Sequence, residues 1–216
     1  MADLTGKRIL CFGDSLTWGF VPAGGGARYG EDIRWTQRLA RLTNATVIEE
    51  GLNGRTSVFQ DPTAPFCCGA DYIEGCVLSQ MPLDLVVVML GTNDMKVFLA
   101  NGCAGASARG IVAVAGKAAA LAGGAPVLVV APPAMGRFIT ELPAELGMME
   151  QLDQKSIDGS WQLAGFLRTF CQQMGFPFMD ANEFVSASRA DAIHMDASGH
   201  KAFAEALAKR VCELLK

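Results

Sequence analysis

Two short runs in the middle of the chain, residues 85–90 (LVVVML) and 127–130 (VLVV), are apolar at every position. A strand with one face in water alternates apolar and polar residues, so a continuous apolar run indicates a strand that is covered on both faces. Such burial is typical of a parallel sheet, because the helices that connect parallel strands pack on its two faces. These runs therefore predict an α/β protein.

The rest of the sequence continues this alternation. The predicted strands are residues 8–13, 45–50, 83–90, 125–132 and 176–181. The predicted helices are residues 32–42, 107–122, 161–174 and a last helix that opens at residues 196–199. Alternating strands and helices with right-handed crossovers predict a three-layer α/β/α sandwich around a five-stranded parallel sheet. Since no internal repeat or linker interrupts the pattern, residues 1–216 are predicted to form a single domain.

Three longer segments, residues 20–31, 55–72 and 132–158, are predicted to be irregular. Long connections in compact α/β domains are more often functional than idle. We expect the third segment to form a pocket wall or a subunit interface, with a plain packed loop as the alternative. This expectation rests on its large apolar side chains, which are Phe138, Ile139, Leu142, Leu146, Met148 and Met149.

Composition argues against several classes of partner. The net charge is −4 and no Lys/Arg-rich run occurs, so neither nucleic acid nor an anionic membrane is an expected partner. No apolar stretch approaches the roughly 18 residues of a membrane span, and the N-terminus lacks the apolar core of a signal peptide. The seven cysteines show no CxxC spacing and predict no zinc site. We expect a soluble cytoplasmic protein, and a bridge among Cys67, Cys68 and Cys76 only if the protein is exported.

Four polar clusters follow predicted strands at their carboxyl ends. They are residues 13–15 (GDS), 51–56 (GLNGRT), 91–94 (GTND) and 191–194 (DAIH). The carboxyl ends of parallel strands lie at one edge of the sheet, which is where open α/β sheets bind ligands. Each cluster alone also fits a turn or a helix cap, for which these residue types are suited. Their convergence on one edge indicates a functional site.

The residue types in these clusters suit nucleophilic catalysis. Ser15 is the candidate nucleophile, His194 its general base, and Asp191 the carboxylate that orients the imidazole. The other histidine, His200, falls inside the last helix and is interpreted as structural. Asp14 is interpreted as a residue that orients local backbone rather than as an acid or base.

A site for acyl transfer also needs donors for the negative charge that develops on the substrate oxygen. Asn93 follows a fully apolar strand, so its amide is expected at the sheet edge, with a turn or helix cap as the alternative. The backbone N–H groups of Gly54 and Ser15 are two further candidate donors, and a glycine leaves room for the approach of a carbonyl group.

The four clusters resemble the conserved blocks of the SGNH (GDSL-type) hydrolases. The matching residues are GDSL at 13–16, the glycine of NGRTS at position 54, GTND at 91–94 and DAIH at 191–194. The resemblance implies a flavodoxin-like α/β/α sandwich, a nucleophilic Ser15 and a triad completed by Asp191 and His194. It further implies an oxyanion hole formed by the N–H of Ser15, by Gly54 and by Asn93.

Longer stretches resemble the arylesterase/acyltransferase branch of that family. They are RILCFGDSLTWG, IEEGLNGRTS, DPTAP and PLDLVVVMLGTNDMK. The resemblance implies a serine esterase that acts on short-chain or aryl esters, with acyl transfer to alcohols or peroxide, in a homo-oligomer and without metal or organic cofactor. Two features depart from the branch. NGR stands in place of serine-alanine-arginine, and residues 132–158 are unlike its proline-rich segment, which bears on acyl preference and subunit number.

The apolar rim of the site is expected to favour small or aromatic esters. The candidate wall residues are Trp18, Phe20 and Phe138. A carbohydrate deacetylase is the alternative enzyme, since the same triad would serve it, although a sugar cleft usually shows more aromatic and amide groups than this chain offers. A non-catalytic binding protein on the same fold is the alternative from another class. The chain has no G-x-S-x-G motif, which argues against an α/β-hydrolase.

Overall fold

The computed structural model describes residues 3–142 and 151–216. Its strands form one parallel sheet in the order β2-β1-β3-β4-β5. The strands are β1 (Arg8–Gly13), β2 (Thr46–Gly51), β3 (Leu85–Met89), β4 (Val127–Ala131) and β5 (Phe178–Asp180). The predicted five-stranded parallel sheet is confirmed, and its order is that of flavodoxin-like folds, in which the ligand site lies where the strand order reverses between β1 and β3.

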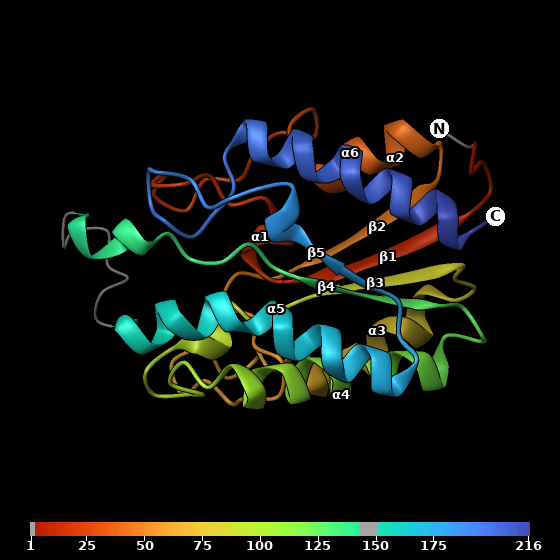
Figure 1. Ribbon diagram of the computed structural model, residues 1–216. Helices are drawn as coiled ribbons and strands as arrows, with labels where there is room; N and C mark the ends of the chain where they lie inside the picture. Colours follow the sequence, from red (N-terminus) through yellow and green to blue (C-terminus); the bar gives the residue numbers. More distant parts are fainter. Residues whose placement is uncertain (1–2, 143–150) are drawn as a thin grey trace.

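Helices cover both faces of the sheet, as Figure 1 shows. The helices are α1 (Ser15–Trp18), α2 (Trp35–Thr43), α3 (Gly69–Gln80), α4 (Ala104–Leu121), α5 (Gln154–Met174) and α6 (Ala197–Leu214). On one face α2 and α6 pack side by side, and on the other α3, α4 and α5 form the second layer. The three-layer sandwich predicted from the sequence is therefore present.

The core consists of two apolar clusters, one on each face of the sheet, because side chains along a strand point alternately to the two faces. In β1, Leu10 and Phe12 face the layer of α3, α4 and α5, whereas Ile9 and Cys11 face α2 and α6. Both sets are buried, because successive side chains of a strand point to opposite faces and both faces are covered. The strands thereby form a rigid base from which the loops at their carboxyl ends project.

Three helix boundaries and one whole helix differ from the sequence-based prediction. Helix α3 falls partly inside the segment predicted as irregular at 55–72, and no helix was predicted there. Its first residue follows Cys68, whose side chain makes no capping hydrogen bond, so the sequence carries no start signal. Helix α5 begins at Gln154 rather than at 161, because Asp153 and Ser156 form a capping box. Helix α2 begins three residues late, at Trp35, and α4 begins three residues early, at Ala104.

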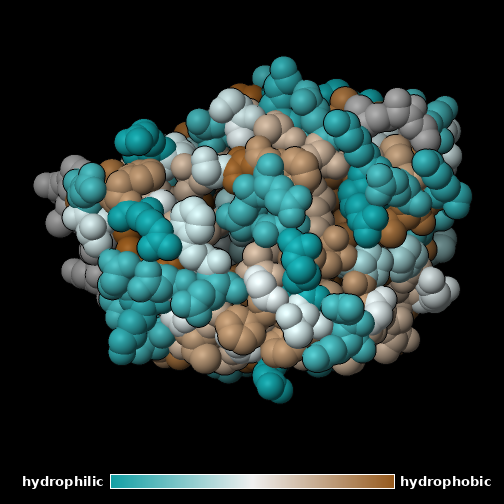
Figure 2. Space-filling view, in the orientation of Figure 1, coloured by the Kyte–Doolittle hydropathy of each residue, from teal (hydrophilic) through white to brown (hydrophobic). Residues whose placement is uncertain are grey.

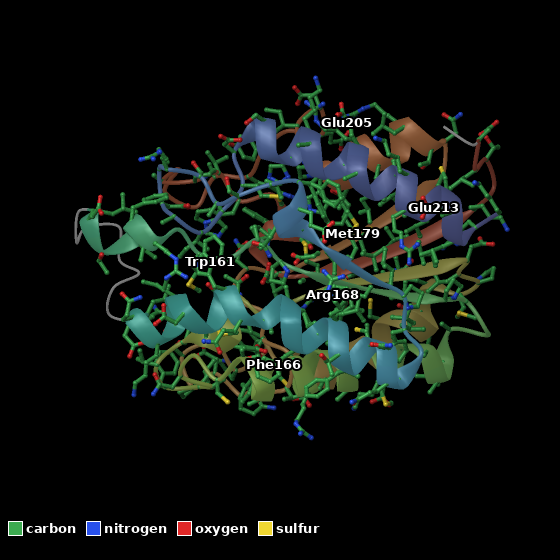
Figure 3. All side chains as sticks on the ribbon, in the orientation of Figure 1. Trp161, Phe166, Arg168, Met179, Glu205 and Glu213 are labelled. Carbon is green, nitrogen blue, oxygen red and sulfur yellow. The ribbon has the colours of Figure 1, made fainter. Side chains whose placement is uncertain are left out.

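The open edge of the sheet at β5 carries a cavity of about 660 Å³. Figure 3 shows Arg168 of α5 below this edge, and Glu205 and Glu213 of α6 above it, with Met179 of β5 between them. Hydrophilic surface covers this edge in Figure 2, with apolar surface below it over α4 and α5. A short edge strand flanked by charged side chains is protected against pairing with another chain. This cavity lies on the flank of the sheet, and Ser15 and His194 do not line it.

Candidate active site

Ser15 stands at the junction of β1 and α1. Strand β1 ends at Gly13, and the carboxylate of Asp14 accepts a hydrogen bond from the N–H of Leu16 at 2.9 Å, which caps the helix. Ser15 is the first residue of α1, and the helix ends at Gly19, whose φ of 89° lies in the left-handed region. The turn residues of the sequence and the position of Ser15 at the carboxyl edge of the sheet thus belong to one local structure.

A chain of two hydrogen bonds joins Ser15, His194 and Asp191. The hydroxyl Oγ of Ser15 lies 2.8 Å from Nε2 of His194, and Nδ1 of the same ring lies 2.7 Å from Oδ2 of Asp191. All three side chains are buried, although they come from opposite ends of the chain. The structure brings the three sequence-predicted residues into the order hydroxyl, imidazole, carboxylate.

The environment of Asp191 fixes the tautomer of the ring. Burial opposes ionisation of this carboxyl, but hydrogen bonds from the His194 side chain and from the N–H groups of Ile193 and His194 outweigh it, so the pKa of Asp191 lies below its usual value. An ionised Asp191 accepts the proton of Nδ1, which leaves Nε2 with its lone pair toward Ser15. This arrangement can move a proton from the hydroxyl of Ser15 to His194.

The segment after β2 approaches α1 closely. A Cβ on Gly51 would lie 2.2 Å from the backbone nitrogen of Trp18, so only glycine allows β2 to end against α1. Gly54 has a φ of 82°, which also favours glycine, whereas a Cβ there would meet only Cys67 Sγ at 3.6 Å. The glycine at 54 is therefore required by its backbone conformation more than by space.

Asn93 lies in the 3-10 helix η1 (Asn93–Met95) that follows β3. Its Nδ2 donates to the carbonyl of Arg55 at 3.1 Å and lies 3.4 Å from Oδ2 of Asp14. The amide therefore joins the loop after β2 to the residue before Ser15. Burial raises the pKa of Asp14 to about 6, against the effect of the hydrogen bond from Leu16 N–H. The 3.4 Å contact is the longer one and so the one more easily exchanged for another acceptor.

One of the three aromatic residues predicted as pocket walls stacks on the imidazole, and a second lies next to that residue. The ring of Phe20 stacks on His194 with centroids 4.4 Å apart, and Trp18 lies 6.3 Å from Phe20. Phe138 lies instead in η2 (Arg137–Glu141), under the guanidinium of Arg189.

Phe138 and Trp161 line a cavity of about 370 Å³ beyond β4 and β5. This observation supports a pocket wall for part of segment 132–158, although Ser15 does not line this cavity. Of the apolar residues predicted there, Leu146, Met148 and Met149 lie outside the described residues.

His200 has a structural environment. Its buried ring accepts a hydrogen bond at Nδ1 from the N–H of Trp35, at 3.4 Å, and meets the edge of Tyr29. Burial, followed by the charge of Arg38, lowers the pKa of His200 to about 4. The ring is therefore held neutral inside the protein.

Three residues in or next to the polar clusters make contacts for which no role was predicted from the sequence. Arg55 donates from its guanidinium to the carbonyls of Gly13 and Glu50 and stacks on Phe12 at 4.1 Å. Ser57 and Asp94 form two hydrogen bonds with each other in the protein interior. The signal that could have found these residues is their position in or directly after the polar clusters that contain Gly54 and Asn93.

No group of three or more His, Cys, Asp or Glu residues in the described ranges could hold a metal ion. Cys67, Cys68 and Cys76 are buried thiols, without a bridge among them. No helix of residues 3–142 or 151–216 is long and apolar enough to cross a membrane.

Comparison with known proteins places this site in a family. The model of the GDSL-like lipase/acylhydrolase family matches residues 11–202. The aryl esterase of M. smegmatis is 36% identical with a TM-score of 0.87, and the match covers 97% of this chain and 100% of that one. Est24, a carbohydrate acetylesterase from Sinorhizobium meliloti, is 32% identical with a TM-score of 0.87, over 96% and 99% of the two chains. A search of curated proteins found no significant match.

The family match covers most of the chain, and the matched residues include all four polar clusters at the carboxyl edge of the sheet. The strand order and the helical layers agree with those structures over nearly the whole length. The chain therefore belongs to the GDSL-like lipase/acylhydrolase family, near its arylesterase branch, and is a carboxylic ester hydrolase.

Proposed function

We propose that this protein is a serine esterase that hydrolyses short-chain or aryl carboxylic esters through an acyl-enzyme. The observation that carries the proposal is the chain of hydrogen bonds from Ser15 Oγ to His194 Nε2 at 2.8 Å and from His194 Nδ1 to Asp191 Oδ2 at 2.7 Å. Such a chain is the arrangement that an activated serine nucleophile needs.

In the first half-reaction, Ser15 Oγ attacks the ester carbonyl carbon while His194 Nε2 accepts the hydroxyl proton. The ionised Asp191 stabilises the imidazolium that results. His194 then protonates the leaving alcohol, and the acyl group stays on Ser15. In the second half-reaction, water gives its proton to His194 and attacks the acyl-enzyme, and His194 returns the proton to Ser15 Oγ as the bond to the acyl group breaks and the carboxylic acid is released. An alcohol or peroxide in place of this water would give acyl transfer.

The negative charge of the tetrahedral intermediate needs donors already in place. The proposed donors are the N–H groups of Ser15 and Gly54 and the side-chain amide of Asn93. Asn93 Nδ2 keeps its bond to the carbonyl of Arg55 and exchanges its 3.4 Å contact with Asp14 for the substrate oxygen. Exchange of a long contact costs little, so the amide is available when the charge develops.

Labelling with a serine-directed phosphonate tests the nucleophile. We expect one modified residue, Ser15, with no labelling of Ser15→Ala and slow labelling of His194→Ala. Ester hydrolysis that proceeds while Ser15 stays unmodified would refute the proposal. Absence of both labelling and hydrolysis in the folded protein would favour a non-catalytic binding protein.

Deacetylation of carbohydrates is the second candidate function. Est24 and a carbohydrate acetylesterase family member, both of Sinorhizobium meliloti, match nearly the whole chain, at 32% and 30% identity. The aryl ester is preferred because the aromatic ring of Phe20 stacks on His194 and the ring of Trp18 lies next to Phe20. Initial rates on phenyl acetate and on acetylated xylooligomers distinguish the two, and a strong preference for the oligomers would reverse the choice.

We further propose that the protein assembles into a homo-oligomer, on the basis of its similarity to the arylesterase branch. Light scattering coupled to size-exclusion chromatography gives the subunit number directly. A monomer at the concentration of the activity assay would contradict this part of the proposal.

A further inference from the structure

Two of the proposed oxyanion donors stand on different segments of the chain. Gly54 lies in the loop after β2, at a φ of 82°, and Asn93 lies in the turn after β3. Donors stabilise a developing charge only when both are directed at the same oxygen before the reaction begins. The relative position of the loop and the turn must therefore be fixed by contacts between them.

The contact between Ser57 and Asp94 fixes the position of the loop after β2 relative to the turn after β3. Ser57 donates from its N–H to Oδ1 of Asp94 at 2.7 Å and from its hydroxyl to Oδ2 at 2.6 Å. Because both carboxyl oxygens bind one residue, the pair fixes orientation as well as distance. A second contact joins the same two segments, since Asn93, directly before Asp94, donates from Nδ2 to the carbonyl of Arg55, two residues before Ser57.

We propose that Ser57 and Asp94 are positioning residues that hold the N–H of Gly54 and the amide of Asn93 in register as oxyanion donors. This inference rests on the proposed esterase function. Ser57 lies three residues after Gly54, and Asp94 directly follows Asn93, so each partner of the pair is coupled to one donor through a short stretch of backbone.

Stability of the fold does not account for this pair. Asp94 has no exposed surface, and no lysine or arginine of the described residues forms an ion pair with it. The cations two residues from each member of the pair in the sequence are engaged elsewhere, since Arg55 binds the carbonyl of Gly13 and Lys96 binds Asp61 at 2.7 Å. A buried carboxyl without a cation is costly compared with a neutral group of the same shape. Such costs are typical of functional sites.

Burial and the neighbouring charge of Asp14 raise the pKa of Asp94 to about 7. Both protonation states keep the pair together, because the hydroxyl of Ser57 can donate to a carboxylate or accept from a carboxylic acid. An asparagine at 94 can do the same with its amide, whereas alanine removes both hydrogen bonds. The series Asp94→Asn and Asp94→Ala therefore separates charge from positioning.

The test measures kcat and KM for phenyl acetate in four variants. We expect Asp94→Ala to lower kcat about 10- to 100-fold, with KM within about twofold of wild type. Ser57→Ala, which keeps its N–H bond, should lower kcat about 3- to 10-fold. Asp94→Asn should recover kcat to within about threefold of wild type. Ser107→Ala is the matched control, since this buried hydroxyl on α4 has no hydrogen-bond partner, and its kcat should not change.

The inference fails if Ser57→Ala and Asp94→Asn both behave like wild type while a folded Asp94→Ala keeps its kcat, or if the losses appear only in KM. It also fails if Asp94→Asn is as impaired as Asp94→Ala. Should Asp94→Ala not fold, a Ser57→Ala kcat within twofold of wild type would overturn the inference. Phosphonate labelling of Ser15 in each variant keeps this result distinct from failure of the proposed function, because labelled Ser15 in the wild type establishes the nucleophile independently.

Discussion

Replacement of Asp94 by asparagine is predicted to change how stability depends on pH. The free energy of unfolding of Asp94→Asn, relative to wild type, should rise by about 2–3 kcal/mol between pH 5 and pH 8. The variant is isosteric and can keep both bonds to Ser57, so the comparison concerns the charge alone.

The magnitude follows from the environment of the carboxyl. Burial, with a smaller contribution from Asp14, raises the pKa of Asp94 from 3.8 to about 7, against the two hydrogen bonds from Ser57. The folded state therefore binds this proton more tightly than the unfolded state. Between pH 5 and 7 the native protein holds about one proton more, so its free energy of unfolding falls by about 1.4 kcal/mol per pH unit and levels off above 7. Asparagine removes this loss.

Urea denaturation at pH 5, 6, 7 and 8 measures the difference, with the fluorescence of the three tryptophans as the signal. Asp32→Asn removes an exposed carboxylate and serves as the control for a change in net charge. Equal slopes with pH for Asp94→Asn and wild type would refute the reasoning, because they would mean that Asp94 ionises as easily in the folded protein as in the unfolded chain.

Three further predictions concern the site and its support. Asn93→Ala should lower kcat about 10²- to 10³-fold, and a loss under tenfold with the fold intact would make Asn93 a turn residue only. His200 is held neutral with a pKa of about 4, below its unfolded value, so its contribution to stability is lost as pH falls. The stability advantage of wild type over His200→Gln should thus shrink by about 3 kcal/mol from pH 7 to pH 4 in urea denaturation. Phe20→Leu should lower kcat about 2- to 10-fold, because the flat contact that restrains His194 is lost, and Phe20→Tyr should retain kcat; equal kcat values in the two variants would contradict this.

The fold could be predicted where burial produces a recognisable pattern of apolar residues in the sequence. The runs at 85–90 and 127–130 are apolar throughout because β3 and β4 are covered on both faces, and the structure buries them fully. Helix α3 shows no such pattern, since its apolar and polar residues are weakly separated onto different faces of the helix and Cys68 provides no cap. The first residue of α5 could have been predicted from the sequence, because the side chains of Asp153 and Ser156 form its capping box.

The sequence indicated which residues come together at the candidate site, but not how their side chains are arranged. Parallel strands bring their carboxyl ends to one edge, so Ser15, Asn93 and the cluster at 191–194 were expected together. Whether an imidazole then meets a hydroxyl depends on side-chain positions set by distant packing. The stacking of Phe20 on His194 and the position of Phe138 in a separate cavity are of this kind. No local pattern encodes contacts between segments so far apart in the chain.

The polar contacts at this edge also explain why an irregular loop can carry a precise site. The loop after β2 is bound to the end of β1 through Leu52 N–H and the guanidinium of Arg55, both on the carbonyl of Gly13. It is bound to the turn after β3 through the pair of Ser57 and Asp94. The apolar clusters on the two faces of the sheet stabilise the fold without these groups. On the proposed mechanism these buried polar residues orient the loop, and Asp94 is buried, at a cost in free energy, at the edge of the sheet where the position of a backbone N–H would affect the rate.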